Sequence, residues 1–112
     1  MSERKPKILL EDMLMCCNKI NTYIGNMTFD EFMADDKTID AVIRNFEILG
    51  EAANRLPEEF KDKFPLIDWY RIRGFRNRIV HDYMGIDFGI VWNIKEYYLP
   101  VLYLQILDVA NE

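Results

Sequence analysis

The sequence predicts an all-α protein, a single domain over residues 1–112 folded as an up-and-down bundle of about four main helices. Apolar residues recur every three or four positions along most of the chain, which is the period of an α-helix. No stretch alternates apolar and polar residues, and no Asn-Gly turn of the kind that joins two strands occurs. Half of the residues are hydrophobic and 29% are charged, a composition typical of a folded domain.

The first predicted helix follows the apolar spacing from Ile8 to Met27. Gly25 and the polar residues beside it interrupt this pattern. Thr28 then has the position of an N-cap, and Glu31 three residues later completes the pattern of a capping box. We therefore expect a short helical turn after residue 28.

A second long helix is predicted to begin at Asp35, Asp36 or Thr38 and to stop before Pro57. The segment PEEFKDKFP, which follows, predicts one short helical turn between two prolines. The apolar face of the long helix consists of Ile39, Val42, Ile43, Phe46, Leu49, Ala53 and Leu56.

The third long helix is predicted to begin at residues 66–68, to run through the four arginines of Arg71–Arg78, and to stop at Gly85. Trp69, at its start, is expected to pack in the core rather than to stack on a nucleobase. Gly74 lies within this helix, where glycine costs about 1 kcal/mol relative to alanine. We expect a close contact with another helix to explain it.

The last helix is predicted to begin at the N-cap Asp87, to reach about Val109, and to be kinked by Pro100. Apolar and aromatic residues cover nearly its whole circumference, so it either lies at the centre of the bundle or is buried by another chain. Because a four-helix bundle encloses none of its helices, we predict a homodimer. The alternative is that the tyrosines, whose tips are polar, tolerate water.

Charge and cysteine content limit the possible functions. The formal net charge of -5 argues against nucleic-acid binding driven by overall charge, but it permits a local basic site. A disulfide between the adjacent Cys16 and Cys17 would be strained in a helix, so we predict core thiols in a reducing compartment. These cysteines and one distant histidine are too few to hold a metal, and neither a metal nor a cofactor is predicted. No apolar run reaches the roughly 20 residues that span a bilayer, so we expect a cytoplasmic protein without membrane contact.

The segment RNRIVHDY contains the one histidine, His81, and two of the clustered arginines. Histidine can accept and donate a proton near neutral pH, and arginine can hold a phosphate through two parallel hydrogen bonds. Arg76 and His81 could therefore cleave RNA without a metal, one assisting proton transfer and the other stabilising charge at phosphorus. A plainer alternative also stays open, in which the arginines are solvated or ion-paired and the histidine caps the helix.

The spacing of these residues complicates such a site. Arg76 and His81 are five residues apart, about 140° around a regular helix, whereas Asn77 and Arg78 share a face with His81. Three arrangements remain open. The Arg76 side chain reaches around the helix, the helix unwinds before His81, or Arg76 of one subunit serves the site of the other. Tyr83 lies beside His81 only if the chain is extended there.

The segment from Arg76 to Tyr83 resembles the R-x-x-x-x-H-x-Y signature of HEPN-domain proteins, specifically the HepT-like toxins. The surrounding segment ILGEAANRLPEEFKDKFPLIDWYRIRGFRNRIVHDYMGID is similar to the central part of that family, and VWNIKEYYLPVL is similar to its last helix. The resemblance extends over residues 8–108 or so, far beyond the short motif.

This resemblance implies a small all-α homodimer whose motif lines a cleft at the dimer interface, and which acts as a ribonuclease toxin on an RNA substrate. It also implies a partner, a nucleotidyltransferase of the MNT class that serves as antitoxin by attaching AMP to the motif tyrosine. By position, Arg76 and His81 would be the catalytic pair, Tyr83 the modified residue, and Asn77 a supporting residue.

Two further arginines, Arg73 and Arg78, are expected to contact RNA phosphates, and this expectation comes from their charge rather than from the resemblance. The family name also suggests an alternative function, that of a non-catalytic adaptor that binds nucleotides or substrate for a minimal nucleotidyltransferase. The sequence does not separate the two functions, because an inactive member could keep every residue of the motif.

Overall fold

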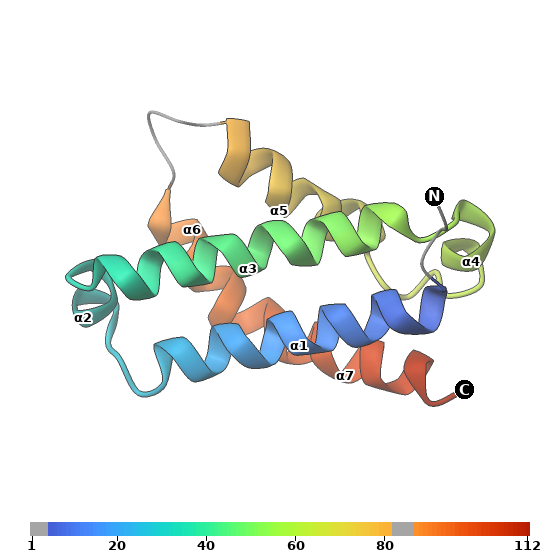
Figure 1. The fold of residues 1–112 in the computed structure, drawn as a ribbon, viewed down its shortest axis with the longest axis horizontal. Helices are drawn as coiled ribbons and strands as arrows, with labels where there is room; N and C mark the ends of the chain where they lie inside the picture. The colour runs from blue at the N-terminus through green and yellow to red at the C-terminus, as the bar shows by residue number, and fades with distance from the viewer. Residues whose placement is uncertain (1–4, 82–86) are drawn as a thin grey trace.

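The structure is a computed structural model that describes the backbone of residues 5–81 and 87–112 and the side chains of residues 5–75 and 87–112. Four long helical segments run alternately in opposite directions, with the short helices α2 and α4 in the connections at opposite ends (Figure 1). The predicted all-α up-and-down bundle is confirmed, and no strand occurs in either described segment of the backbone. In chain order the helices are α1 (Pro6–Ile24), α2 (Phe29–Met33), α3 (Asp36–Arg55), α4 (Glu58–Asp62), α5 (Trp69–His81), α6 (Phe88–Asn93), η1 (Ile94–Tyr98) and α7 (Leu99–Ala110).

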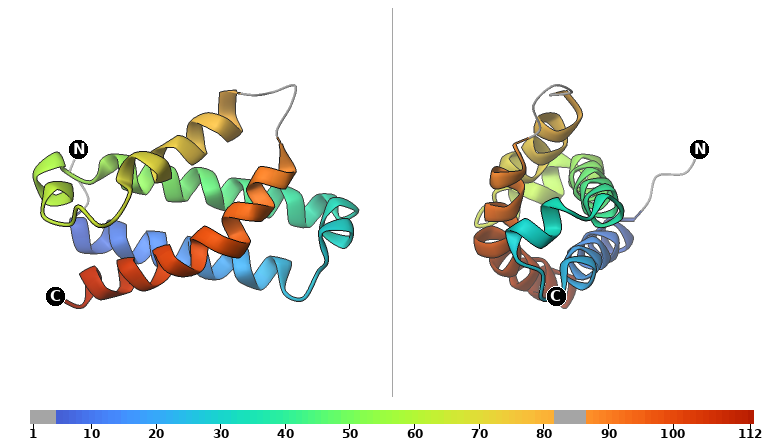
Figure 2. Two further views of the ribbon diagram at one scale, coloured as in Figure 1. Left: turned by 180° about the vertical axis from the view of Figure 1, so that it is seen from behind. Right: turned by 90° about the vertical axis from the view of Figure 1, so that its left-hand side faces the viewer.

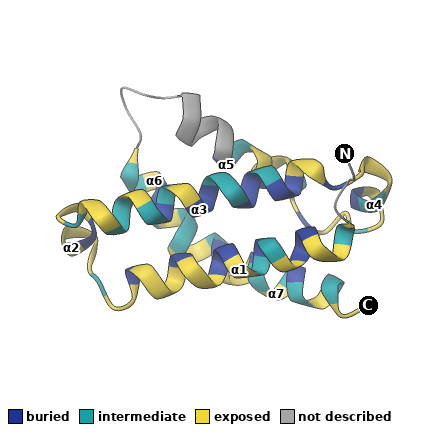
Figure 3. Ribbon diagram, in the orientation of Figure 1, coloured by how far each residue is buried: buried dark blue, intermediate teal, exposed yellow. Residues whose placement is uncertain are grey.

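The core lies between α1 and α3, which pack against each other along their length, and it extends to α5 over α3 and to α7 over α1. Figure 3 shows buried positions along the facing sides of α1 and α3 and exposed positions on their outer sides. This is the arrangement that the apolar spacing predicts. The largest fully buried side chains are Phe32, Phe46, Leu9, Met13, Ile20, Ile24, Leu49, Leu56, Ile72, Leu99, Leu102 and Ile106.

The predicted helix boundaries in the first half of the chain are confirmed. Gly25 ends α1 with a positive φ of 54°, a backbone conformation that favours glycine. Thr28 and Glu31 form both hydrogen bonds of the capping box, at 3.1 and 2.9 Å. Asp35 caps α3 by accepting the Thr38 backbone N–H at 3.1 Å. The short turn after Pro57 is α4.

Helix α5 begins slightly later than predicted, at Trp69, because Asp68 acts as its cap. The Asp68 Oδ1 accepts the Arg71 backbone N–H at 3.0 Å, so residue 68 precedes the helix. Trp69 packs against the core, and its indole N–H donates to the Phe64 carbonyl at 3.1 Å, so the predicted packing role is confirmed. The predicted stop at Gly85 lies outside the described residues.

The last helix differs from the single kinked helix that was predicted. Asp87 caps α6 as expected, accepting the backbone N–H groups of Gly89 and Ile90 at 2.9 and 3.3 Å. A π-helical turn, η1, then separates α6 from α7, and the chain bends there (Figure 2). Pro100 explains the wide turn, because its ring clashes with the carbonyl four residues earlier in a regular α-helix.

The predicted core thiols are confirmed. Cys16 and Cys17 are both free and buried. Burial raises the pKa of Cys16 to about 11, with the Asp12 carboxylate adding to the effect, and burial beside Cys16 raises the pKa of Cys17 to about 12. Both thiols are therefore protonated at neutral pH. Of the helices in the described part of the chain, none is long and apolar enough to cross a membrane.

Candidate active site

The predicted site residues other than Tyr83 belong to α5, which is helical without a break from Trp69 to His81. The helix is anchored by Ile72 and Phe75, which are buried against the core formed with α3. The continuous helix excludes one of the three arrangements left open by the sequence, in which the chain unwinds before His81. Side chains from residue 76 to residue 86 lie outside those that the structure describes, and so does the whole of Tyr83.

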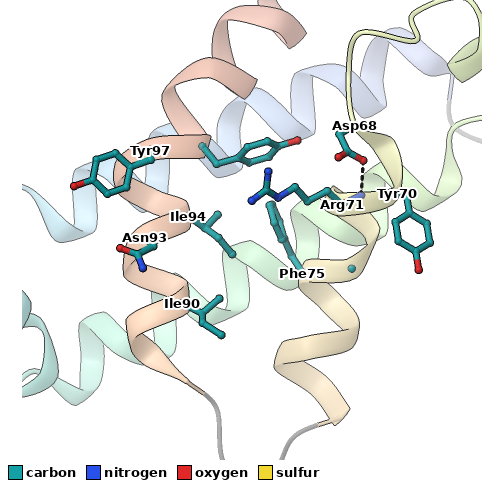
Figure 4. A pocket seen from close by; sticks show the side chains of 10 residues that line it. Asp68, Tyr70, Arg71, Phe75, Ile90, Asn93, Ile94 and Tyr97 are labelled. Carbon is teal, nitrogen blue, oxygen red and sulfur yellow. Dashed lines mark hydrogen bonds between the residues drawn. The ribbon is translucent and has the colours of Figure 1, made fainter.

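Beside α5 the structure contains a groove of about 790 Å³, here called the α5–η1 groove. One wall comes from α5 and the other from α6 and η1, as Figure 4 shows. Tyr70 and Tyr97 lie at its two outer rims and are 78% and 76% exposed. The residues that line the inside are Arg71, Gly74 and Phe75 from α5 and Ile90, Asn93 and Ile94 from the opposite helix.

The positively charged group among the residues that line this groove is Arg71, which reaches from α5 toward η1 (Figure 4). Its guanidinium carbon lies 4.5 Å from the centre of the Tyr98 ring, a cation–π distance. Tyr98 packs edge-on against Phe75, with ring centres 5.7 Å apart, and Phe75 packs in the same way on Phe46 of α3 at 5.8 Å. The guanidinium is thus held by a series of aromatic rings that begins in the core.

Tyr98 supplies a second polar group beside the groove. Its hydroxyl is buried and has no hydrogen-bond partner among the side chains described. Burial raises the pKa of Tyr98, the Asp68 carboxylate raises it further, and the Arg71 charge opposes them. The phenol therefore stays protonated at neutral pH and can act as a hydrogen-bond donor.

Arg73, predicted as a phosphate contact, leaves α5 on a different side from Arg71. It lies 5.5 Å from the centre of the Tyr70 ring and lines a separate hollow toward α4, together with Lys61 and Asp62. The structure therefore does not bring Arg73 into the α5–η1 groove. The tyrosine between these two hollows, Tyr70, lines both.

The predicted close contact at Gly74 is not made within the chain. A Cβ atom built on Gly74 would have no heavy atom within 4 Å among the described residues, so no neighbouring helix of the same chain requires glycine at this position. Gly74 instead lines the open α5–η1 groove, where the missing side chain leaves space. A contact of Gly74 with a second chain stays a prediction.

The helical register relates the groove to the predicted catalytic positions. Positions 78 and 81 follow Gly74 by four and seven residues, so regular spacing places them on the side of α5 that borders the groove. Position 76 lies about 140° away from position 81 around the helix axis. The backbone thus separates the positions of Arg76 and His81 onto different sides of α5.

Sequence reasoning missed Arg71, Asn93 and Tyr98 as members of a site. Arg71 was seen only as part of the arginine cluster, and Tyr98 only as part of an apolar helix. These two residues are far apart in the chain, and no local spacing connects them. A signal did exist in the excess of aromatic residues on the last helix, which a cation can use as stacking surfaces.

No metal site is apparent in the described part of the molecule, where no three His, Cys, Asp or Glu side chains gather as ligands. The polar groups at the α5–η1 groove are instead a guanidinium, an amide, three phenols and the Asp68 carboxylate that caps α5. This donor set suits anions and hydrogen-bonding rings better than cations.

Comparisons with known proteins point to one family. The family model described as ribonuclease HepT-like matches residues 13–109, which include all of α5. An inferred RNase of Methanocaldococcus jannaschii is 39% identical over 94 residues, covering 84% of this chain and 78% of the relative. An inferred RNase of Caldanaerobacter subterraneus is 30% identical over 109 residues, or 97% of each chain. An inferred ribonuclease HepT of Thermococcus cleftensis is 34% identical over 100 residues, or 89% of this chain and 91% of the relative. No solved structure matches the chain significantly.

Proposed function

We infer that this chain, which belongs to the ribonuclease HepT-like family of HEPN proteins, cleaves RNA internally and without a metal ion, using Arg76 and His81. The observation that carries the proposal is the family match over residues 13–109, which contains the whole motif on and after one continuous helix. RNA is the substrate class, since the family and its inferred members are ribonucleases.

The proposed reaction uses the ribose 2′-hydroxyl next to the scissile phosphate as nucleophile. His81 transfers a proton, either from this hydroxyl or to the leaving 5′-oxygen, and Arg76 stabilises the negative charge that builds up on the phosphorane. The O–P bond to the 5′-oxygen breaks as the bond from the 2′-oxygen forms. The products are a 2′,3′-cyclic phosphate and a 5′-hydroxyl, and DNA, which lacks the nucleophile, is not cut.

The active form is proposed to be a homodimer. The last helix exposes Tyr97, Val101 and Leu104, which are 76%, 52% and 65% exposed and recur at intervals of four and three residues along one side. Leu66 and Tyr70 of the neighbouring chain segment are 89% and 78% exposed. A second copy that covers this apolar stripe would account for the excess of apolar residues on the last helix.

A dimer also suits the separation of the two catalytic positions. Positions 76 and 81 lie on different sides of a continuous α5, so one residue of each pair can come from the partner subunit. Asn77 and Arg78, between them, are proposed as a supporting residue and a phosphate contact. Arg73 is proposed to contact phosphates farther from the cleavage point, since it lines a different hollow from Arg71.

The proposed biological role is that of a toxin whose antitoxin is a minimal nucleotidyltransferase that attaches AMP to Tyr83. Tyr83 lies two residues after His81 in the sequence. An adenylyl group there adds negative charge and a bulky base beside the catalytic histidine, which repels RNA phosphates and competes for the arginines. Adenylylation would therefore switch off the nuclease.

A cleavage assay tests the central part of this proposal. The wild-type chain, His81→Ala and Arg76→Ala are purified identically without a partner and incubated with tRNA and mRNA in EDTA. Cleavage by the wild type alone, with 2′,3′-cyclic phosphate ends, is the expected result. If the unmodified wild-type chain, checked by mass, leaves RNA intact, the nuclease proposal fails and the adaptor function takes its place.

A mixing experiment tests whether the dimer shares its sites. Arg76→Ala and His81→Ala chains are unfolded, mixed in equal amounts and refolded together. If Arg76 acts on the partner's site, each mixed dimer contains one intact site, and about a quarter of the wild-type activity returns. If both residues of a site come from one chain, the mixture stays as inactive as the separate variants.

A further inference from the structure

The α5–η1 groove contains a guanidinium, that of Arg71, which forms no ion pair with the described acidic residues. The chain has 19 acidic residues, yet none of those described forms an ion pair with the Arg71 guanidinium. The Asp68 carboxylate lies close by, but its Oδ1 accepts the backbone N–H of Arg71 and caps the helix. In a protein of net charge -5, such an arginine is available to an anionic ligand.

The guanidinium is already stacked on a ring in the absence of a ligand. Arg71 lies 4.5 Å over the ring of Tyr98, and Tyr98 in turn packs on the buried Phe75. Stacking on a ring leaves the N–H groups at the edge of the guanidinium free to donate to a phosphate. Because little side-chain freedom is left to lose, binding here costs less entropy than binding to a freely moving arginine.

The opposite wall of the groove suits a flat ring with a polar edge. Ile90 and Ile94 form its apolar surface and point toward α5, and the Asn93 amide, which can both donate and accept hydrogen bonds, lines the groove from the other side of the same helix (Figure 4). The groove volume of about 790 Å³ is within the range of small-molecule sites. A nucleobase attached to a phosphate matches this combination of an apolar wall, one amide and one guanidinium.

We propose that the α5–η1 groove binds one nucleotide of single-stranded RNA next to the cleavage point, with Arg71 on its phosphate and its base against Ile90 and Ile94. This inference rests on the proposed ribonuclease function and adds a substrate-positioning site to it. The groove borders the side of α5 on which position 81 lies, so a strand bound there continues toward the catalytic histidine. The Arg71 cation inside the groove suits an anionic strand, whereas the second copy proposed above covers the exposed Val101 and Leu104 farther along the last helix.

The test measures binding separately from cleavage. The probe is a fluorescent single-stranded oligonucleotide of 2′-O-methyl RNA, which keeps the phosphates and bases but lacks the attacking hydroxyl. Fluorescence anisotropy gives its Kd at several salt concentrations. We expect Arg71→Gln to weaken binding about tenfold, through the loss of one charge-assisted contact. The slope of log K against log salt should fall by about 0.7, the value for one single-strand phosphate contact.

Arg55→Gln is the matched control, because Arg55 is an exposed arginine on α3 whose partner is Glu51 on the same helix. Its removal takes away the same charge from a surface outside the groove. Binding by Arg55→Gln should match that of the wild type in both Kd and salt slope. An equal loss in the two arginine variants would mean that only overall charge matters, and it would overturn the proposal.

Gly74→Leu tests the groove without changing any charge. No atom lies within 4 Å of a Cβ at this position, so the backbone accepts a side chain there, and that of leucine would extend into the groove beside Arg71. We expect binding at least about tenfold weaker with a melting temperature that is not lowered, since leucine favours helix more than glycine does. Wild-type affinity in Gly74→Leu and Arg71→Gln would overturn the proposal. Loss of binding together with a change from dimer to monomer mass would also overturn the proposal, because it would indicate that a second copy occupies the groove.

Failure of this inference is distinguishable from failure of the proposed function. If the wild type cleaves RNA while probe binding does not depend on Arg71, the groove proposal falls and the nuclease stands. If the wild type does not cleave RNA, but Arg71→Gln and Gly74→Leu both bind the probe more weakly than the wild type does, the groove proposal stands and the catalytic proposal falls.

Discussion

The α1–α3 pair and the α5–η1 side of the molecule use similar residues in opposite ways. Between α1 and α3, residues such as Met13, Phe46 and Leu49 are at most 1% exposed. On the α5–η1 side, Tyr70 and Tyr97 are more than three-quarters exposed, and an arginine rather than an aliphatic group covers the ring of Tyr98. Mainly aliphatic side chains, together with the Phe46 ring, fill the core in the first region, whereas aromatic rings border an open groove in the second.

The surface that stabilises the fold therefore differs from the surface proposed to bind a ligand, and α5 contributes to both. Ile72 and Phe75 on one side of α5 are buried and hold the helix against α3. Arg71 and Gly74 border the groove. A helix anchored in this way can present groups to a ligand at fixed positions, which is what a catalytic or binding site requires.

The largest expected effect on stability comes from Phe46→Ala, in the α1–α3 region. Phe46 is 1% exposed and contacts the Phe75 ring, so its removal leaves a cavity where α3 meets α5. We expect a loss of about 3–5 kcal/mol in the free energy of unfolding, measured by urea denaturation. Met15→Ala is the control, because Met15 is 55% exposed on α1, outside the proposed dimer interface, and its truncation should change stability little. Similar losses in both variants would contradict the assignment of stability to the core.

The second prediction concerns the buried thiols of α1. Burial raises the pKa of Cys17 from 9.0 to about 12, so folding stabilises the protonated thiol. This contribution is fully present below about pH 9 and is lost as the pH rises toward the folded pKa, because the unfolded chain releases the proton first. By pH 10.5 the loss from this group should be about 2 kcal/mol.

The measurement is the free energy of unfolding against pH for the wild type and Cys17→Ala. The variant should show a shallower decline above pH 9, whatever its stability at neutral pH. Parallel curves for the two proteins would show that Cys17 does not titrate differently in the folded and unfolded chains.

A smaller effect is expected from Gly25→Ala, at the end of α1. The φ of 54° at this residue is unfavourable for a side chain with a Cβ atom. We expect a loss of about 1–2 kcal/mol in thermal or chemical unfolding. Gly74→Ala is the matched control, since it lies inside a regular helix with free space and should be neutral or stabilising. A larger loss of stability in Gly74→Ala than in Gly25→Ala would contradict this explanation of both glycines.

The smallest expected change in the stability of the separate chain comes from Leu104→Glu, in the exposed stripe of the last helix. A single exposed substitution should alter the stability of the separate chain by about 0.5 kcal/mol or less. It should nevertheless convert the proposed dimer into a monomer, as measured by light scattering, because it places a charge in the interface. Met15→Glu, which changes a residue of α1 that is 55% exposed, should leave the dimer intact. A dimer that survives Leu104→Glu would place the interface elsewhere.

The sequence was sufficient to predict the fold where local rules decide the structure. The capping box at Thr28, the cap at Asp35, the short helix after Pro57 and the cap at Asp87 all depend on residues a few positions apart. The buried face of α3 follows from its apolar period. Each of these features is specified by neighbouring residues.

Prediction was less successful where the outcome depends on how helices meet. The sequence around Gly74 does not show whether this residue faces a helix or a groove, because that depends on where η1 lies. The stacking of Arg71 on Tyr98 joins residues that are distant in the chain. Pro100 indicates a disturbance of the last helix, but it does not determine that a π turn rather than a kink absorbs it. The motif at Arg76 and His81 was found through resemblance, since its spacing alone left a plainer alternative open.

We infer that α5 performs the chemistry and that the α1–α3 core provides the stability. The most direct measurement compares His81→Ala with Phe46→Ala, each assayed for RNA cleavage per folded molecule at low temperature and for unfolding in urea. We predict that His81→Ala loses about 10²–10⁴-fold in cleavage rate with unfolding like that of the wild type. Phe46→Ala should show a large loss of stability with most of its cleavage per folded molecule retained. Wild-type cleavage by His81→Ala, or a loss of stability in it as large as that of Phe46→Ala, would contradict the account.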